Sequence, residues 1–379
     1  MVFASTLGLA LVAVWGTSVA TAKPGISLST SGPAAVSDVS ALKITASLKN
    51  TGTETLRLLK DPNSLLSTWE TDSFQVARAE SSLVNTPSLN FTGIRVKYSP
   101  TAAIKSGKSD LFTIIEPGAT VNITHSLASS YDFTSKAAGA GKYKFRPSTR
   151  ARTFLSVSAD GTITPLEATE GQVAEVSVSG RLAGPRLQPG AQGAAHGIGP
   201  FEHGKDVAKR ALFRGCNSGQ INDINSAADR AMNMAHGAHG FLRDGPWGTR
   251  RYTEWFGAWD QGRYQSVFQH YDNIRFNPPT FNYDCTCTDD GIYAYVIIPG
   301  HFKEVYLCGA FWRAPLEGTD SKAGTIIHEA SHFPEYAGTS DHVYGQGGCR
   351  DLARNDPGRA VMNADSHEYF AENEPWLGQ

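Results

Sequence analysis

Apolar and polar residues alternate in short runs over the first part of the chain, from about Gly25 to Gly180. Every second residue from Leu42 to Leu48 is apolar, and the run ends at the turn-forming sequence Asn50-Thr51-Gly52. Such alternation is typical of a strand with one buried face. We therefore expect an all-β sandwich of immunoglobulin-like size, because similar runs separated by turn residues recur at Val121 and Ile123, at Tyr143 and Phe145, and at Val173, Val176 and Val178.

The spacing of apolar residues changes in the second part of the chain, from about Ala211 to Gln379. Apolar residues recur three and four positions apart between Ile221 and Leu242, which predicts a long amphipathic helix after Asn217-Ser218. The aromatic-rich segment 251–271 predicts a second helical region, and the apolar runs 292–298 and 305–307 predict strands. We expect a small α+β domain here.

Residues 181–210 separate the two parts. Gly, Pro and Ala dominate this segment without an apolar period, which indicates an exposed linker. It ends in Lys209-Arg210, a dibasic pair that secretory processing proteases cleave, although an ordinary charged linker end is the alternative. The chain is therefore expected to consist of an N-terminal segment (1–22), the β-sandwich (23–180), the linker (181–210) and the α+β domain (211–379).

Residues 1–22 have the pattern of a secretory signal peptide. An apolar run from Leu7 to Trp15 is followed by the small residues Ala20 and Ala22, although no Lys or Arg lies near the start. A buried N-terminal strand or helix is the alternative interpretation. Two N-glycosylation sequences, at Asn90 and Asn122, also fit a secreted, extracellular protein.

Charge and the length of the apolar runs argue against two classes of partner, nucleic acid and a membrane. The 34 basic residues nearly cancel the 36 acidic ones, and no basic run carries interleaved aromatic residues, so we do not expect nucleic acid. No apolar run reaches the roughly 18 residues that a membrane helix requires. The expected partners are protein or peptide substrates, and the mature form is expected to be a monomer.

All five cysteines lie in the second part of the chain. In a secreted protein they predict disulfides, and the odd number leaves one cysteine over. Cys285 and Cys287 are too close in sequence to pair with each other without strain. A zinc–cysteine cluster is the alternative interpretation, which an oxidising compartment disfavours. The five cysteines are Cys216, Cys285, Cys287, Cys308 and Cys349.

The segment His328-Glu329-Ala330-Ser331-His332 has the spacing of a catalytic zinc site. Two histidines four residues apart lie on the same face of a helix, where both can bind one zinc ion, and Glu329 is offset as a base acting on zinc-bound water. Asp320 or Ser321 can cap this helix, and Pro334 with Gly338 ends it. The alternative is two surface histidines on a helix.

A catalytic zinc takes three protein ligands and keeps one position open. A metzincin would place Gly and His at the positions of Glu335 and Gly338, so the sequence excludes that class. From the residue chemistry alone, Asp341 and His342 are both candidates for the third ligand.

The sequence Gly338-Thr-Ser-Asp-His-Val-Tyr-Gly345, close after the two histidines, resembles the second motif of the deuterolysin and peptidyl-Lys metalloendopeptidase family, the aspzincins. The resemblance covers about 211–379 and implies a zincin-like catalytic domain with one Zn²⁺, with a sheet edge lining the cleft. It implies Asp341 as the third ligand and Tyr344 as the group that stabilises the oxyanion. It also implies the disulfides Cys216–Cys285 and Cys287–Cys308, with Cys349 unpaired.

The first part is then implied to be a propeptide. No cysteine precedes Cys216, so a cysteine cannot block the zinc. His196 or His203 in the linker has the chemistry to do so, but a linker histidine is far more often solvated than a ligand. Lys205 and Lys209 raise the hypothesis that the enzyme trims its own propeptide.

Asp365 and Glu368 are three residues apart and share one face if their segment is helical. The segment resembles the lysine-specific members of the family, in which an acidic group at the position of Asp365 lines the pocket for the residue after the scissile bond. A carboxylate there selects an ammonium group. The alternative is two solvated carboxylates on a terminal helix.

The sequence therefore predicts a secreted zinc endopeptidase, made as a proenzyme, that cuts on the amino side of lysine. A broad-specificity deuterolysin-like protease is the second interpretation. The third is a secreted binding protein with a structural metal site, which would have no need of Glu329.

Overall fold

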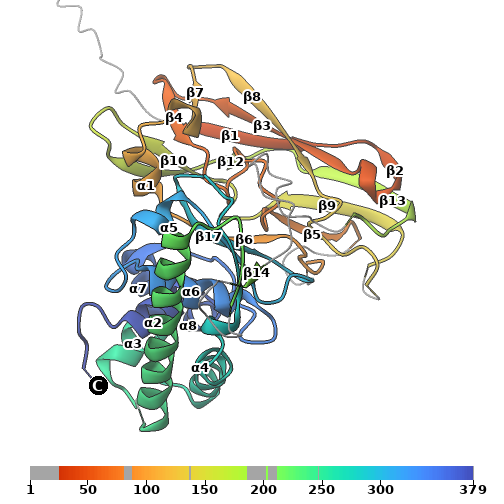
Figure 1. Ribbon diagram of the computed structural model, residues 1–379. Coiled ribbons are helices and arrows are strands. Elements are labelled where there is room, and N and C mark those ends of the chain that lie inside the picture. Colours follow the sequence, from red (N-terminus) through yellow and green to blue (C-terminus); the bar gives the residue numbers. More distant parts are fainter. Residues whose placement is uncertain are drawn as a thin grey trace, which may run out of the picture.

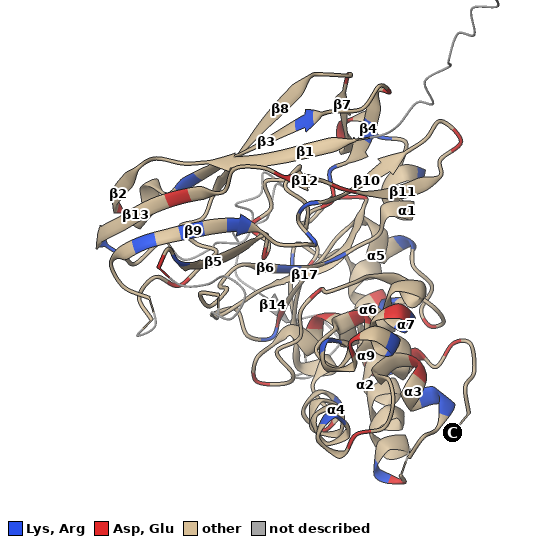
Figure 2. Cartoon of the chain, turned by 180° about the vertical axis from the view of Figure 1, so that it is seen from behind, with Lys and Arg blue, Asp and Glu red and all other residues tan. Residues whose placement is uncertain are grey.

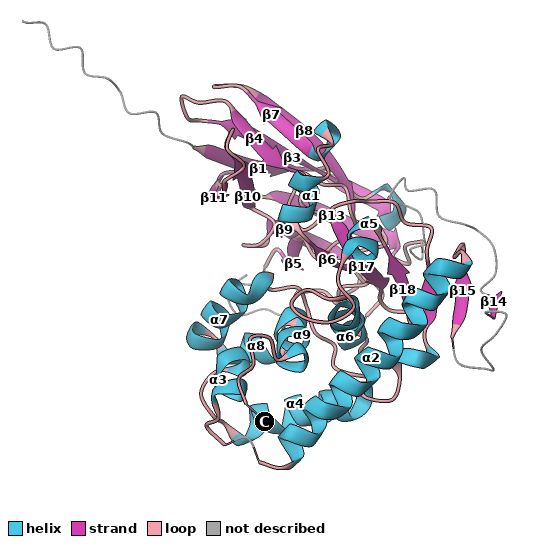
Figure 3. Ribbon diagram, turned by 60° about the vertical axis from the view of Figure 1, so that its left-hand side comes forward, coloured by secondary structure: helices cyan, strands magenta, loops and turns pink. Residues whose placement is uncertain are grey.

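The computed structural model describes residues 25–80, 88–135, 138–185, 202–203, 211–245 and 247–378. The predicted signal peptide, the lysines at 205 and 209 and the dibasic pair lie outside these residues. Strands from the first part of the chain form one layer and helices from the second part form another, with a sheet at their junction (Figure 3). Within the described residues, no helix combines the length and apolar character needed to cross a membrane.

The first part is built mainly of strands in three four-stranded sheets around one core. Alternation produces this core directly: Ile44, Ala46 and Leu48 are fully buried while Lys43 and Lys49 face outward. The sheets have the orders β12-β1-β3-β8, β11-β10-β4-β7 and β2-β13-β9-β5. Their strands are β1 Ile26–Ser31, β2 Ala35–Asp38, β3 Lys43–Asn50, β4 Leu56–Leu59, β5 Phe74–Arg78, β7 Phe112–Ile115, β8 Thr120–Ser126, β9 Gly141–Pro147, β10 Thr153–Val157, β11 Ile163–Glu167, β12 Thr169–Glu170 and β13 Ala174–Arg181.

An immunoglobulin-like sandwich is not confirmed for this part. That fold has two antiparallel sheets, whereas here three sheets share the core and two of them contain a parallel pair, β1 with β12 and β13 with β2. A short helix, α1 Pro100–Lys105, also interrupts the strands. Alternation predicted which residues are buried, but it carries no information on which strands pair.

The second part contains eight α-helices among the described residues, and the long helix α2 spans its length (Figure 1). The side chains of Asn217 and Gln220 form a capping box at the start of α2, and the predicted apolar face is buried from Ile224 to Leu242. The expected second helical region is two helices, α3 and α4, because the chain turns at Gly257 with φ 79°. The helices are α2 Ser218–Arg243, α3 Arg250–Phe256, α4 Gln261–Ile274, α5 Gly309–Arg313, α6 Lys322–His332, α7 Gly345–Asn355, α8 Pro357–Val361 and α9 Ala364–Glu372.

A six-stranded sheet joins the two parts. Its order is β14 Glu202–His203, β15 Leu212–Arg214, β16 Asn282–Asp284, β18 Glu304–Leu307, β17 Ile292–Ile297 and β6 Ile94–Tyr98. β6 comes from the first part and pairs antiparallel with β17, with Val96 opposite Tyr295. A small apolar core beneath this pair contains Val96 and Ile94 together with Ile297. Acidic residues lie in the helical layer next to these two strands (Figure 2).

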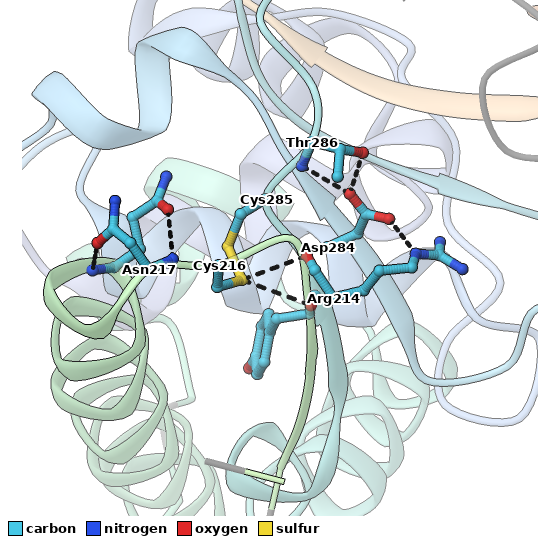
Figure 4. Close-up of a disulfide and its surroundings, with 8 residues drawn as sticks. Arg214, Cys216, Asn217, Asp284, Cys285 and Thr286 are labelled. Atoms are coloured by element: carbon cyan, nitrogen blue, oxygen red, sulfur yellow. Dashed lines mark hydrogen bonds and ion pairs between the residues drawn. A yellow bond between two sulfur atoms is a disulfide. The ribbon is translucent and has the colours of Figure 1, made fainter. Parts of the chain in front are cut away.

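The two disulfides implied by the resemblance are present. Cys216 at the start of α2 pairs with Cys285 after β16, across 69 residues (Figure 4). Cys287 pairs with Cys308 across 21 residues. Cys349 is buried and unpaired. The first bond fixes the N-terminal end of α2 against β16 of the six-stranded sheet, which α5 and α6 also contact.

Replacing Cys216 and Cys285 with serine is expected to lower the free energy of unfolding by about 4 kcal/mol, because the bond closes a long loop in the unfolded chain. Urea unfolding of the oxidised protein measures this change. The matched variant is Cys349→Ser, which removes a thiol that forms no disulfide and therefore closes no loop in the chain. It should lower the unfolding free energy by much less, and an equal loss in both variants would contradict the loop-closure argument.

Candidate active site

Helix α6 carries the first two predicted ligands and the predicted base. Ser321 caps it by accepting a hydrogen bond from the Gly324 backbone N–H at 2.9 Å, and the helix ends at His332, two residues before Pro334. His328, Glu329 and His332 are all fully buried. The two histidines face the same side of the helix, as their spacing predicts.

The chain after α6 turns back at Gly338, where φ is 63°, and brings Asp341 to the histidines. Asp341 Oδ1 lies 3.1 Å from His328 Nε2 and 3.3 Å from His332 Nε2. The structure therefore brings the three predicted ligands together.

The positions of these three atoms suit binding to one shared metal ion. None of them has a hydrogen-bond partner, although all three are buried. Ligand atoms about 2.0 Å from a tetrahedral zinc ion are about 3.3 Å apart, close to the two separations found here. Two imidazole nitrogens and a carboxylate oxygen are also a donor set that zinc prefers.

His342, the other candidate for the third ligand, lies outside this group. Its Nδ1 lies 3.3 Å from Arg359 Nη2. Burial, reinforced by the nearby guanidinium of Arg359, lowers the pKa of His342 to about 4.

An oxygen atom lies close to the other ring nitrogen of each histidine. His328 Nδ1 lies 2.7 Å from Asp365 Oδ1, and His332 Nδ1 lies 3.0 Å from the backbone oxygen of Thr339. Such contacts leave Nε2 free to bind a metal and fix the orientation of the ring. Asp365, which the family resemblance assigns to the substrate pocket, thus also lies against His328.

Glu329 lies beside the three ligands on α6. Neither of its carboxylate oxygens has a hydrogen-bond partner. Burial raises the pKa of this carboxyl group well above its ordinary value. A buried carboxyl group next to a metal site is suited to accept and return a proton.

Tyr344 lies at the N-terminal end of α7. Its hydroxyl group donates a hydrogen bond to the backbone oxygen of Val96 and accepts one from Asn63 Nδ2 at 2.6 Å. The predicted oxyanion-stabilising residue is therefore already bonded to a peptide carbonyl, on strand β6.

Helix α9 places two further carboxylates next to the ligands. Asp365 and Glu368 are 1% and 0% exposed, so the interpretation as solvated carboxylates is wrong. α6 and α9 approach closely at Gly324, where a Cβ atom would lie 3.0 Å from Glu368 Cγ and 2.1 Å from Glu372 Oε1. This close contact needs a glycine.

The ammonium group of Lys97, from β6, occupies this acidic site. Lys97 Nζ lies 2.6 Å from Glu368 Oε2 and 3.5 Å from Asp365 Oδ1. It also lies 3.1 Å from Oδ1 of Asp320, whose side chain is 40% exposed. Burial lowers the pKa of Lys97, but the carboxylates of Asp365, Glu368 and Asp320 outweigh this and raise it well above the ordinary value.

Sequence reasoning missed Lys97, Asp320 and Asn63. Asp320 directly precedes Ser321, which caps α6, so the local pattern predicts only a capping role for it. Lys97 and Asn63 come from the first part of the chain, and no local pattern connects them with the site.

Comparison with known proteins places this arrangement in a family. A family model described as "Lysine-specific metallo-endopeptidase" matches residues 243–372. A peptidyl-Lys metalloendopeptidase of Grifola frondosa is 40% identical over 93% of this chain and 94% of its own length. One from Pleurotus ostreatus is 49% identical over 168 residues, which are 44% of this chain and 99% of that protein. A solved zinc peptidase from Grifola frondosa is 44% identical, with 43% of this chain and 100% of that chain covered and a TM-score of 0.42.

The identity with the first of these relatives extends over nearly the whole of both chains. This chain therefore belongs to the lysine-specific metallo-endopeptidase family and is a metalloendopeptidase.

Proposed function

We propose that this protein is a secreted zinc endopeptidase that cleaves peptide bonds on the amino side of lysine and is made as a proenzyme. One observation carries the specificity: the ammonium group of Lys97, whose side chain is only 2% exposed, lies among three carboxylates, of which Asp365 and Glu368 are buried beside His328. A buried site of this charge favours a cation through short, charge-assisted contacts. It disfavours apolar side chains, which would leave the carboxylates unpaired.

His328, His332 and Asp341 would hold the zinc ion, and their buried, unpaired ligand atoms support this assignment. When bound, zinc supplies Lewis acidity, which polarises a peptide carbonyl group and lowers the pKa of a coordinated water. Asp365 and the Thr339 backbone oxygen keep the two imidazole rings in position.

Glu329 would accept the proton of the attacking water and return it to the departing amine, because its carboxylate is buried beside the ligands. Tyr344 would donate its hydroxyl hydrogen bond to the carbonyl oxygen as negative charge develops there. The hydrogen bond from Tyr344 to the Val96 oxygen supports this role, since a peptide carbonyl already reaches that hydroxyl group.

The proenzyme proposal rests on the lengths of the relatives. The Pleurotus ostreatus protein matches over 168 residues and 99% of its own length. This is about the length of the chain from residue 211 onward, so we propose that residues 23–180 are a propeptide. The two disulfides support passage through an oxidising compartment.

Mass spectrometry of the peptides that the matured, purified protein releases from a denatured protein tests this function. We expect products that begin with lysine and disappear in the presence of a zinc chelator. Chelator-sensitive products with mixed first residues would overturn the lysine specificity and favour a broad-specificity protease. Cleavage that persists in the chelator would overturn the zinc assignment.

Glu368→Gln is expected to lower kcat/KM for lysine peptides by about 10- to 100-fold, because it removes the closest charge partner of the ammonium group. Its contact with His328 Nδ1 is longer, at 3.5 Å, than that of Asp365, so this variant disturbs the metal ligands less than a change at Asp365 would. Steady-state kinetics on peptides with lysine or methionine after the scissile bond, with zinc content measured in parallel, checks the result.

Asp320→Asn is the matched variant, because the Asp320 side chain is partly exposed and lies outside the group of metal-ligand candidates. Its effect should be smaller, because exposed ion pairs contribute little. A Glu368→Gln enzyme that keeps the full lysine preference would contradict the proposed pocket.

A further inference from the structure

β6 is an edge strand of the six-stranded sheet and lies beside the candidate metal ligand Asp341. It pairs antiparallel with β17 over five residues, from Ile94 opposite Ile297 to Tyr98 opposite Ile292. Peptides that bind a sheet edge use this arrangement: main-chain hydrogen bonds hold the strand and pockets receive its side chains.

The Val96–Lys97 peptide lies at the catalytic centre. The Val96 backbone N–H donates a hydrogen bond to Asp341 Oδ2 at 3.2 Å, and the Val96 backbone oxygen accepts one from Tyr344. The next side chain, that of Lys97, enters the acidic site. The bond on the amino side of a lysine therefore lies beside a candidate metal ligand and the candidate oxyanion donor.

The lysine side chain is fully enclosed. Its ammonium group lies 5.1 Å from the ring of Tyr293 and 5.8 Å from the ring of Tyr369, in addition to its three carboxylate neighbours. A buried lysine surrounded by partners on every side is an anchor, whereas a lysine in an ordinary interface remains largely solvated.

Two further segments of the first part, one at Asp61–Asn63 and one at Arg150, hold Tyr344. Asn63 donates a hydrogen bond to its hydroxyl group, and the Arg150 guanidinium lies 5.2 Å from its ring centre. Arg150 is itself fixed by Asp61 at 2.6 Å. These contacts keep the oxyanion donor on the Val96 carbonyl and away from any other peptide.

We propose that β6 inhibits the enzyme from within the same chain as a bound, substrate-like strand, with Val96 and Lys97 on the two sides of the position where substrates are cut. The proposal rests on the proposed lysine specificity, since Lys97 fills the site that a substrate lysine would fill. A peptide substrate cannot enter until β6 leaves β17.

Peptide binding to the full chain tests this proposal in the Glu329→Gln background, so that nothing is cleaved. The probe is a fluorescein-labelled peptide with the β6 sequence Ile-Arg-Val-Lys-Tyr, and fluorescence anisotropy measures its affinity. We expect the further substitution Lys97→Met to tighten binding at least tenfold. Lys97→Glu should tighten it further, because it adds a fourth carboxylate to the site.

Lys108→Met is the matched control. Lys108 forms an ion pair at 2.5 Å with Asp290 of the second part, but its side chain is half exposed and lies outside the acidic site. This variant should bind the probe no better than its parent. If Lys97→Met also binds no better, or if both variants gain equally, the inhibitory strand is overturned.

A second probe with methionine in place of lysine separates this proposal from the lysine specificity. Tighter binding of both probes alike after Lys97→Met would support the blocked cleft and overturn the lysine specificity. Tighter binding of the lysine probe alone would support both.

Amine labelling of the unsubstituted full chain gives a test that needs no variant. Acetic anhydride should modify Lys97 at least tenfold more slowly than Lys108, as measured by mass spectrometry of the digested protein. Equal labelling of the two lysines would overturn the proposal.

Discussion

Glu329→Gln is expected to lower kcat for cleavage of a lysine peptide by about 10³-fold, because glutamine cannot accept a proton from the attacking water. The side chain has almost the same volume and is fully buried on α6 among groups that remain unchanged. We therefore expect the zinc content and the melting temperature to stay close to those of the parent. Steady-state kinetics on the matured enzyme and elemental analysis of bound metal check both parts.

Glu335→Gln is the control for this prediction, since Glu335 is an exposed glutamate shortly after the same helix. It should leave kcat within a factor of two. A Glu329→Gln enzyme that retains a tenth or more of the parent kcat would exclude Glu329 as the proton acceptor. Loss of zinc in the same variant would assign it a structural role instead.

His332→Ala is expected to abolish detectable activity and to remove the bound zinc. A site with two remaining ligands, His328 and Asp341, binds the ion far more weakly, and no residue among the described parts of the chain lies in the same group to replace the imidazole. Equilibrium dialysis against zinc, followed by elemental analysis, measures the loss. Removing zinc from the parent with a chelator should reproduce the inactive state.

His342→Ala is the matched control, because His342 directly follows Asp341 in sequence but lies outside the group of candidate ligands. It should keep one zinc ion per chain and most of the activity. A His342→Ala protein without zinc, beside a His332→Ala protein that retains it, would contradict the proposed ligand set.

Local spacing accounts for the parts of the site that sequence reasoning anticipated. His328, Glu329 and His332 share one helix, so four residues of sequence determine their relative positions. The long helix α2 was predicted for the same reason, from an apolar period and a cap next to it in sequence. Both disulfides were implied by the family resemblance, not by spacing.

The missed features depend on contacts between distant segments. β6 pairs with β17, which lies about 200 positions later in the chain, and alternation in either strand indicates only which face is buried. The immunoglobulin-like sandwich expected for the first part is not confirmed for the same reason, since alternation does not determine which strands pair. Lys97 is one of many lysines in the sequence, and only the tertiary structure distinguishes it from the solvated ones.

Under the proposed maturation, the pairing of β6 with β17 also determines which sheet edge becomes exposed. Once β6 is removed, the outer N–H and C=O groups of β17 face water, and so does the apolar surface that Ile94 and Val96 cover. An uncovered edge of this kind pairs readily with other extended chains, including a second copy of itself. Under the same proposal, β6 also protects the proenzyme from aggregation by covering this edge, and the mature enzyme would carry the edge uncovered.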